Sequence, residues 1–332
     1  MKFLIIGLGS MGKRRIRNLQ FLKQTEIIGF DLDENKRKES EKKYSIKTFK
    51  KFEDSLDENP DVFIISTPPD LHMKYAKIAI EKGIHFFTEA SVIQDEMEDV
   101  IKKLKNLDVI GMPSCTMRYH PIIKKINEIL NSEKLGKVLS FSYHSGQYLP
   151  DWHPWEDYRK FYVSRKNTGA CREIVPFELV WLISTFGQIE KVFADKSKVS
   201  SLEIDIDDIY NILINCENGV KGVLTVDVIS RPAIRKLRIL TELGTIEADW
   251  YEKSIKYHIS NQGWNEIKID DGFVEENYLH GEKMYIEEIE NFLQSIQKVT
   301  TQKYTFNEDL KILKILSVIE KSSDLGIQQK VS

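Results

Sequence analysis

Three glycines with the spacing G-x-G-x-x-G, Gly7, Gly9 and Gly12, lie in the sequence GLGSMG. The loop directly follows the apolar run KFLII and opens a stretch with apolar residues at helical spacing. In such a unit the first glycine permits a tight turn, the second lets the backbone approach a pyrophosphate, and the third allows close helix packing. Ser10 and Met11 complete the loop, where the helix N-terminus would face the phosphates. The spacing therefore predicts a dinucleotide site.

A second apolar run, EIIGF, ends in Asp31, about 20 residues after the loop. A carboxylate at this point can accept hydrogen bonds from the adenosine ribose hydroxyls, and it would repel a 2′-phosphate. Since no arginine immediately follows Asp31, the sequence favours NAD(H) over NADP(H). Arg14 and Arg15, just after the loop, leave two alternatives open: they assist the phosphates, or they are solvated.

The segment STPPDLH, residues 66–72, follows another apolar run, DVFII. Its prolines hold the backbone extended, so the chain is expected to turn across the carboxyl edge of a sheet. Ligands bind at that edge in open α/β sheets. We therefore include Thr67, Pro68, Pro69 and His72 among the cofactor-binding residues. The alternative is a rigid turn without a chemical role.

Short apolar runs alternate with amphipathic stretches over the first 120 residues. The runs are KFLIIG, EIIGFD, DVFIIST, IHFFTE and DVIGM. They are apolar on both faces, as expected for parallel strands with crossover helices on each side. The pattern predicts an α/β fold with a Rossmann-type parallel sheet over residues 1–120.

The pattern changes from about residue 134 to longer strand-like runs joined by turn signals such as Glu217-Asn218-Gly219. The alternation predicts a C-terminal α+β domain over 121–300, with a largely antiparallel open sheet, followed by a terminal helix in 301–332. An apolar helix from about Pro176 to Phe186 interrupts the strands, with Pro176 in the first turn, where its missing N–H needs no partner. Alternating large residues suggest that one face meets a partner in a homodimer or homotetramer; these are Tyr210, Ile212, Leu224, Val226 and Val228.

Composition and charge exclude several classes of protein. With 48 basic and 51 acidic residues the net charge is −3, which argues against a nucleic-acid surface. The three cysteines and seven histidines show no metal-ligand spacing, and the cysteines no disulfide framework. Gly7 interrupts the first apolar run after about five residues, too early for a signal peptide or membrane span. We expect a cytoplasmic protein with no metal and no membrane or nucleic-acid partner.

Several segments, in order, resemble the Gfo/Idh/MocA family, which includes glucose-fructose oxidoreductase and inositol dehydrogenase. They are GLGSMGKRRIRNL, STPPDLH, MRYHP at 117–121, LPDWHPWEDYRKFY at 149–162, NTGACREIVPFELVWLISTFG at 167–187 and NEDLKILKILSVIEKSSDLG in the last helix. The resemblance spans nearly the whole chain. It implies a nicotinamide cofactor, a sugar or polyol substrate, and a terminal helix that returns to the Rossmann domain.

The family's usual proton-handling residues are replaced at the matching positions. Family members carry Glu-Lys-Pro after the fifth strand, whereas this chain has Glu89-Ala90-Ser91. A family Asp, followed four residues later by the general-acid His, corresponds here to Glu173 and Phe177. The resemblance implies that Glu89 lies beside the cofactor. Glu173 remains a carboxylic acid, and burial near a nicotinamide would raise its pKa into a useful range.

The matched second-domain segments provide further candidates. We predict Glu173, His153 and Tyr119 as catalytic residues. The predicted substrate-binding residues offer donors, charges or aromatic faces; they are Arg118, Trp152, Tyr158, Tyr162, Arg165, Lys166 and Phe177. For each group a structural alternative stays open: His153 as a packed loop residue, the tryptophans, tyrosines and Phe177 as core, and Arg165 with Lys166 as solvated surface.

Together these features predict an NAD(H)-dependent oxidoreductase that interconverts an alcohol and a ketone on a sugar, nucleotide-sugar or polyol. Loss of the usual acid–base assistance costs about 10²- to 10⁴-fold in rate, which leaves room for turnover. The alternative is a non-catalytic nicotinamide-nucleotide-binding protein, a sensor or accessory subunit. A third possibility is an enzyme that retains its cofactor, oxidising and then re-reducing its substrate around an elimination.

Overall fold

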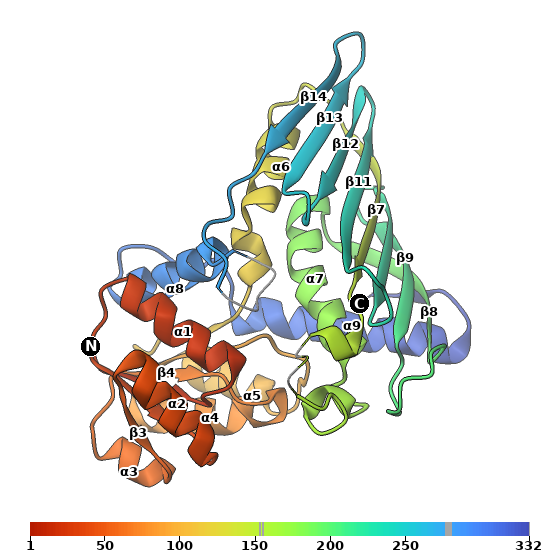
Figure 1. Ribbon diagram of the computed structural model, residues 1–332. Helices are drawn as coiled ribbons and strands as arrows, with labels where there is room; N and C mark the ends of the chain where they lie inside the picture. The colour runs from red at the N-terminus through yellow and green to blue at the C-terminus, as the bar shows by residue number, and fades with distance from the viewer. Residues whose placement is uncertain (153, 155, 276–280, 332) are drawn as a thin grey trace. The chain divides into compact units, whose positions relative to one another are not determined.

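The computed structural model describes residues 1–152, 154, 156–275 and 281–331, and the chain forms two compact units (Figure 1). The first consists of Met1–Thr116 and Glu282–Lys311, and the second of Met117–Gly281 and Ile312–Ser332. Residues 282–300, which we expected in the second domain, group with the first unit. The reason is a set of buried ion pairs that joins the segment around α8 (Lys283–Ile296) to α1 (Ser10–Phe21).

The first unit is built on a six-stranded parallel sheet with the order β3-β2-β1-β4-β5-β6. Its strands are β1 (Phe3–Ile6), β2 (Ile27–Phe30), β3 (Lys47–Phe49), β4 (Val62–Ile65), β5 (His85–Thr88) and β6 (Gly111–Pro113). Every residue of β1, β2 and β4 is buried, because helices cover both faces of such a sheet. The predicted Rossmann-type sheet is confirmed, and its order reverses between β1 and β4.

Helices alternate with these strands as the sequence pattern predicted. They are α1, α2 (Glu34–Tyr44), α3 (Phe52–Leu56), η1 (Pro69–Leu71), α4 (His72–Lys82) and α5 (Met97–Leu104), while α8 comes from a later part of the chain and packs against α1. The Asp33 side chain caps α2 by accepting from the amides of Asn35 and Lys36, and Gly83 ends α4 in a left-handed conformation. The short η2 (Thr116–Tyr119) and α9 (Phe306–Leu325) each run across the boundary between the two units in sequence.

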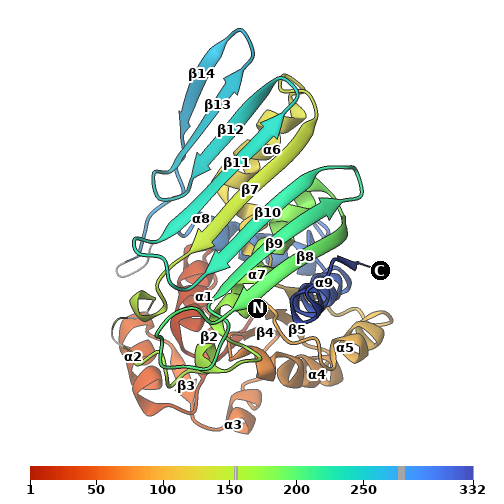
Figure 2. The same cartoon turned by 90° about the vertical axis from the view of Figure 1, so that its right-hand side faces the viewer.

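A nine-stranded open sheet with the order β14-β13-β12-β11-β7-β10-β9-β8-β15 forms the second unit (Figure 2). Its strands are β7 (Val138–Gly146), β8 (Ile189–Ser197), β9 (Ile209–Cys216), β10 (Lys221–Asp227), β11 (Ile234–Thr241), β12 (Gly244–Asp249), β13 (Ser254–Ile259), β14 (Gly263–Lys268) and β15 (Gln329–Lys330). Neighbours pair antiparallel except β7 and β10, which are parallel. The predicted, largely antiparallel open sheet is confirmed.

The central helix of this unit, α7 (Ala170–Phe186), begins about six residues earlier than predicted. Pro176 is therefore inside the helix rather than in its first turn, where it removes one backbone hydrogen bond. The earlier start follows from Gly169, which has an extended backbone and precedes a run that continues the helical pattern. The remaining helices of the unit are α6 (Pro121–Asn131), η3 (Leu149–Asp151) and η4 (Tyr162–Ser164).

Helices α6 and α7 lie against one face of this sheet and leave the other face open (Figures 1 and 2). The prediction that Tyr210, Ile212, Leu224, Val226 and Val228 face a partner is wrong: all five are buried on the helix-covered side. Side chains alternate along a strand, so the adjacent positions point to the opposite face. Leu213, Val223 and Phe193 occupy those positions, with 51%, 39% and 39% of their surface exposed.

A buried carboxylate, Glu178 on α7, fastens this helix to the sheet. It accepts hydrogen bonds from four side chains, Tyr143 (3.0 Å), Ser145 (3.0 Å), Trp181 (2.7 Å) and Arg235 (2.8 Å). The side chain of Glu178 is fully buried, so the pair with Arg235 is shielded from solvent. A charge in such a place is tolerated only when its partners satisfy it.

We predict that Glu178→Gln lowers the free energy of unfolding by about 3 kcal/mol or more, because the guanidinium of Arg235 is left in the interior without its counter-charge. Urea denaturation followed by circular dichroism measures the loss. Glu266→Gln is the control, since Glu266 pairs with Lys268 on the exposed surface, and its loss should stay below about 1 kcal/mol. Equal losses in the two variants would show that the buried network does not hold α7.

Candidate functional site

The glycine loop between β1 and α1 is a cradle built from backbone. A Cβ on Gly12 would lie 1.9 Å from the carbonyl oxygen of Gly7, and one on Gly7 would lie 2.6 Å from that of Ser66. Gly7 also has a left-handed φ of +95°. Around Gly9, by contrast, the space is open within 4 Å. The N-cap residue of α1 is Gly9, which has no side chain to accept from the amides of the first turn, and a helix N-terminus suits an anionic group.

Asp31 ties the end of β2 to this loop. Its Oδ2 accepts from the Leu8 amide at 2.8 Å, and its Oδ1 accepts from the Asp33 amide at 2.8 Å. A carboxylate offers about four acceptor positions, so lone pairs remain for ribose hydroxyls. The predicted pair of loop and carboxylate is thus brought together, and the residues fit a dinucleotide.

Sequence reasoning missed Arg37 as a residue of this corner. Its Nη1 donates to the carbonyl oxygens of Asp31 (2.7 Å) and Leu32 (2.9 Å). No arginine immediately follows Asp31 in the sequence, but the first turns of α2 bring Arg37 back to it. A wider window in the sequence would have found this guanidinium, which bears on the choice between NAD(H) and NADP(H).

The proline turn after β4 is stabilised by a hydrogen bond between a histidine and the backbone. His72 starts α4, and its Nε2 lies 2.9 Å from the carbonyl oxygen of Thr67. Burial lowers the pKa of His72, so the ring is neutral and supports the turn. Pro69 is buried at the start of η1. Thr67 and Pro68 therefore have a fixed backbone at the carboxyl edge of the sheet, next to the glycine loop.

Arg14 and Arg15 are both buried and bind carboxylates, so they are not solvated. Arg14 pairs through Nε with Glu282 at 3.0 Å. Arg15 binds both oxygens of Glu89 through Nε and Nη2, each at 2.8 Å. Ser66 also donates to Glu89, which lies directly after β5. That Glu89 lies beside the cofactor stays a prediction.

In the second unit, Glu173 is a carboxyl group with one unused oxygen. It lies in the first turn of α7, and its Oε1 accepts from the Tyr162 hydroxyl at 2.9 Å. Its Oε2 is buried and has no hydrogen-bond partner within the described residues. Burial raises the pKa of Glu173 to about 7, against a smaller lowering by the Tyr162 hydrogen bond. Such a group can both accept and donate a proton near neutral pH.

The other predicted substrate-binding and catalytic residues differ in burial and in hydrogen-bond partners. Tyr119 is buried, and Arg118 donates through Nε to the Val180 carbonyl at 3.1 Å. Trp152 donates to the Gln147 carbonyl at 3.2 Å, whereas Tyr158 accepts from the Glu203 amide at 3.3 Å. Phe177 is half-buried one turn after Glu173, and Arg165 and Lys166 are exposed. His153 lies outside the described residues, as does Trp155.

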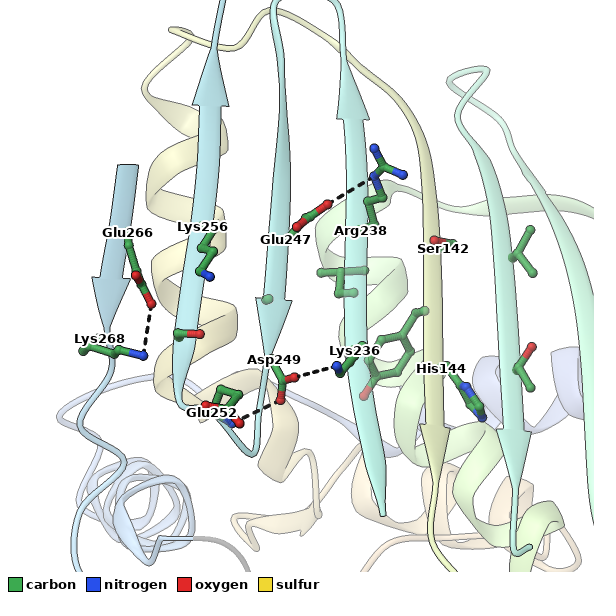
Figure 3. A pocket seen from close by; sticks show the side chains of 16 residues that line it. Ser142, His144, Lys236, Arg238, Glu247, Asp249, Glu252, Lys256, Glu266 and Lys268 are labelled. Carbon is green, nitrogen blue, oxygen red and sulfur yellow. Dashed lines mark hydrogen bonds and ion pairs between the residues drawn. The ribbon is translucent and has the colours of Figure 1, made fainter. Parts of the chain in front are cut away.

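A shallow hollow of about 650 Å³ lies on the open face of the second sheet (Figure 3). Cross-strand ion pairs line it, Lys236 with Asp249 at 3.1 Å and Arg238 with Glu247 at 3.5 Å. The face is the one opposite α7, so the hollow is separate from Glu173.

Within the described ranges, no group of three or more His, Cys, Asp or Glu side chains is arranged to hold a metal ion. In the same part of the chain, no helix is both long and apolar enough to span a bilayer.

Comparisons with known proteins agree with this architecture. The model of an oxidoreductase family with an NAD-binding Rossmann fold, GFO/IDH/MocA, matches residues 1–112, and the model of the GFO/IDH/MocA C-terminal domain matches residues 123–247. D-xylose 1-dehydrogenase (NADP(+)) 2 of Haloferax volcanii is 22% identical over 274 residues, which cover 81% of this chain and 80% of that protein.

Two solved structures have the same fold. Levoglucosan dehydrogenase in complex with NADH and L-sorbose has a TM-score of 0.86 at 16% identity, with 100% of this chain and 99% of that chain covered. An oxidoreductase from Agrobacterium radiobacter in complex with NAD+, L-tartaric acid and magnesium has a TM-score of 0.87 at 13% identity, with 100% and 98% covered. With both family models matched in order and the backbone cradle of the first unit in place, the chain belongs to the Gfo/Idh/MocA family of NAD-binding oxidoreductases.

Proposed function

We propose that this enzyme is an NAD(H)-dependent dehydrogenase that interconverts an alcohol and a ketone on a sugar, nucleotide-sugar or polyol. The observation that carries the proposal is the loop of the first unit, in which open space at Gly9 adjoins the N-terminus of α1 and the Asp31 carboxylate. Relatives named for xylose and levoglucosan support a carbohydrate substrate. A screen of aldoses, ketoses and polyols for a change in nicotinamide absorbance tests it, and failure of NADH to bind would remove it.

The chemistry divides between the cofactor and the protein. A bound nicotinamide would supply the hydride transfer to or from the substrate carbon, and the protein would handle the accompanying proton. Glu173 is our candidate for the accompanying proton: its free Oε2 takes the hydroxyl proton during oxidation and returns it during reduction. The Tyr162 hydroxyl holds the other oxygen and so orients the carboxyl group. Tyr119 and His153 are the remaining catalytic candidates; Glu173 is preferred because its unpartnered oxygen and its pKa of about 7 suit proton exchange.

Substrate hydroxyls would be bound by side chains that the sequence singled out in the second unit. Arg118 and Tyr158 offer donors, Trp152 and Phe177 offer aromatic surface, and Arg165 and Lys166 offer exposed charge. The non-catalytic alternative is less favoured. The buried, unpartnered oxygen of Glu173 lowers the stability of the fold, and a protein that only binds a nucleotide would gain nothing from this loss.

The open face of the second sheet supports assembly into a homodimer or homotetramer. Phe193, Leu213 and Val223 are cross-strand neighbours, so their exposed side chains form one apolar row. Charged pairs of both signs continue the face toward β14 (Figure 3). A self-complementary surface of this kind suits a second copy of the chain. We also propose a cytoplasmic location, in keeping with three buried free cysteines.

Asp31→Ser should shift the cofactor preference toward NADP(H). Removing the carboxylate takes away acceptors for the ribose hydroxyls and the repulsion of a 2′-phosphate, while Arg37 remains nearby. We expect the ratio of NADPH to NADH affinity to rise by about tenfold or more, a change of about 1.4 kcal/mol. Fluorescence titration with both nucleotides measures it. Adding Arg37→Gln should remove most of the gain, and an unchanged ratio in Asp31→Ser would contradict the assigned role.

The rates should depend on pH through Glu173. Its carboxylate form is the base for alcohol oxidation, so that rate should rise as the pH increases through about 7, whereas ketone reduction should fall. Glu173→Gln should lose this dependence together with about 10²- to 10⁴-fold in kcat. Tyr162→Phe removes a hydrogen bond that lowers the pKa, so its inflection should move to higher pH. Identical pH profiles in all three proteins would exclude Glu173 as the acid–base group.

A further inference from the structure

Arg15 is a fully buried arginine on the helix that the glycine loop opens. Its Nε and Nη2 grip the two oxygens of Glu89, and Nη2 also reaches Oε2 of Glu288 at 2.9 Å. The guanidinium lies 4.7 Å from the ring centroid of Phe87, on β5. Planar guanidinium groups that bind carboxylates bidentately fix direction as well as distance. Arg15 therefore sets where both carboxylates lie relative to α1.

Glu288 connects Arg15 to the residues that follow β6. It is fully buried on α8 and accepts from the Ser114 hydroxyl (3.0 Å), the Cys115 amide (2.6 Å) and the Thr116 hydroxyl (2.8 Å). These three residues directly follow β6, just as Glu89 directly follows β5. One guanidinium thus fastens the carboxyl ends of two neighbouring strands to the glycine-loop helix.

The strand order shows why this connection matters. The sheet has two halves, β1 to β3 and β4 to β6, and a dinucleotide binds across the point where the order reverses. The glycine loop, α1 and Asp31 belong to the first half. The strand ends held through Arg15 belong to the second half. Buried ion clusters are poor sources of stability, since apolar replacements are often as stable, so a positioning role is the better explanation of this one.

We propose that Arg15 is a positioning residue of the dinucleotide site, which holds the carboxyl ends of β5 and β6 in register with the glycine loop so that both halves bind one ligand. The inference rests on the proposed function, that the chain binds a nicotinamide dinucleotide. If this is so, Arg15 contributes to the affinity for a ligand that spans both halves of the sheet. It does not contribute to the affinity for a ligand that occupies the first half alone.

Arg14 provides a matched control on the same helix. It is also buried, and it pairs with a fully buried carboxylate, Glu282, to which Asn18 and Arg17 donate as well. Glu282 immediately precedes α8 and does not follow a strand. Loss of this pair should destabilise the unit as much as loss of the Arg15 pair, but it should leave the strand ends in place.

The experiment compares Arg15→Lys and Arg14→Lys in the full chain by titration with NADH, which spans both halves, and with ADP, which has only the adenosine and diphosphate. Lysine keeps the charge and loses the two-pronged geometry. We expect Arg15→Lys to bind NADH about tenfold more weakly and ADP within about twofold of the wild type. Arg14→Lys should bind both ligands as the wild type does, with a similar fall in the thermal midpoint.

Glu288→Gln is the second variant, for use if Arg15→Lys does not fold. The side chain of Glu288 is fully buried on α8. The variant should bind NADH more weakly than the wild type, by a smaller factor than Arg15→Lys, and should bind ADP as the wild type does. Equal weakening of NADH and ADP in these variants, or unchanged NADH binding, would overturn the inference. A wild-type chain that binds neither nucleotide would instead refute the proposed function.

Discussion

The close backbone approach in the turn after β1 is the constraint on which the first unit depends. The carbonyl of Gly7 lies where a Cβ of residue 12 would be, so α1 can pack on β1 only if that position is glycine. The same turn places the Leu8 amide on Asp31 and starts α1 at Gly9, around which the space is open. It also sets the direction of α1, and with it the places that Arg14 and Arg15 can reach.

Three glutamates with buried carboxyl oxygens differ in how their charge is satisfied, and the difference separates a structural role from a chemical one. Glu178 and Glu288 each accept from four groups, including one arginine. Their lone pairs are occupied, so they hold elements together. Glu173 accepts from Tyr162 alone, and its second oxygen has no partner among the described residues. A carboxyl group in that condition retains a proton more readily and has a free atom with which to exchange it.

The sequence was most informative where a local pattern has one physical explanation. Apolar runs buried on both faces predicted the parallel sheet, and the glycine spacing predicted a turn that side chains would block. The sequence was least informative about which face of a strand is buried. The alternating residues of β9 and β10 were visible, yet which set faces α7 depends on register, and Tyr210 and Leu224 proved to be on the covered face. The start of α7 was predicted too late, at Pro176. The helix continues through this proline because its burial compensates the backbone hydrogen bond that the proline removes.

By itself, the sequence determined the two-sheet architecture, the family and the cradle, because each follows from the spacing of a few residue types along the chain. Only the tertiary structure decided the partners of charged side chains. Arg15 and Glu288 are 273 positions apart and Asp31 and Arg37 are six apart, yet both contacts depend on how helices pack against strands. Charged residues look alike in a sequence. Their roles are decided by desolvation and by the atoms that remain in reach once the chain has folded.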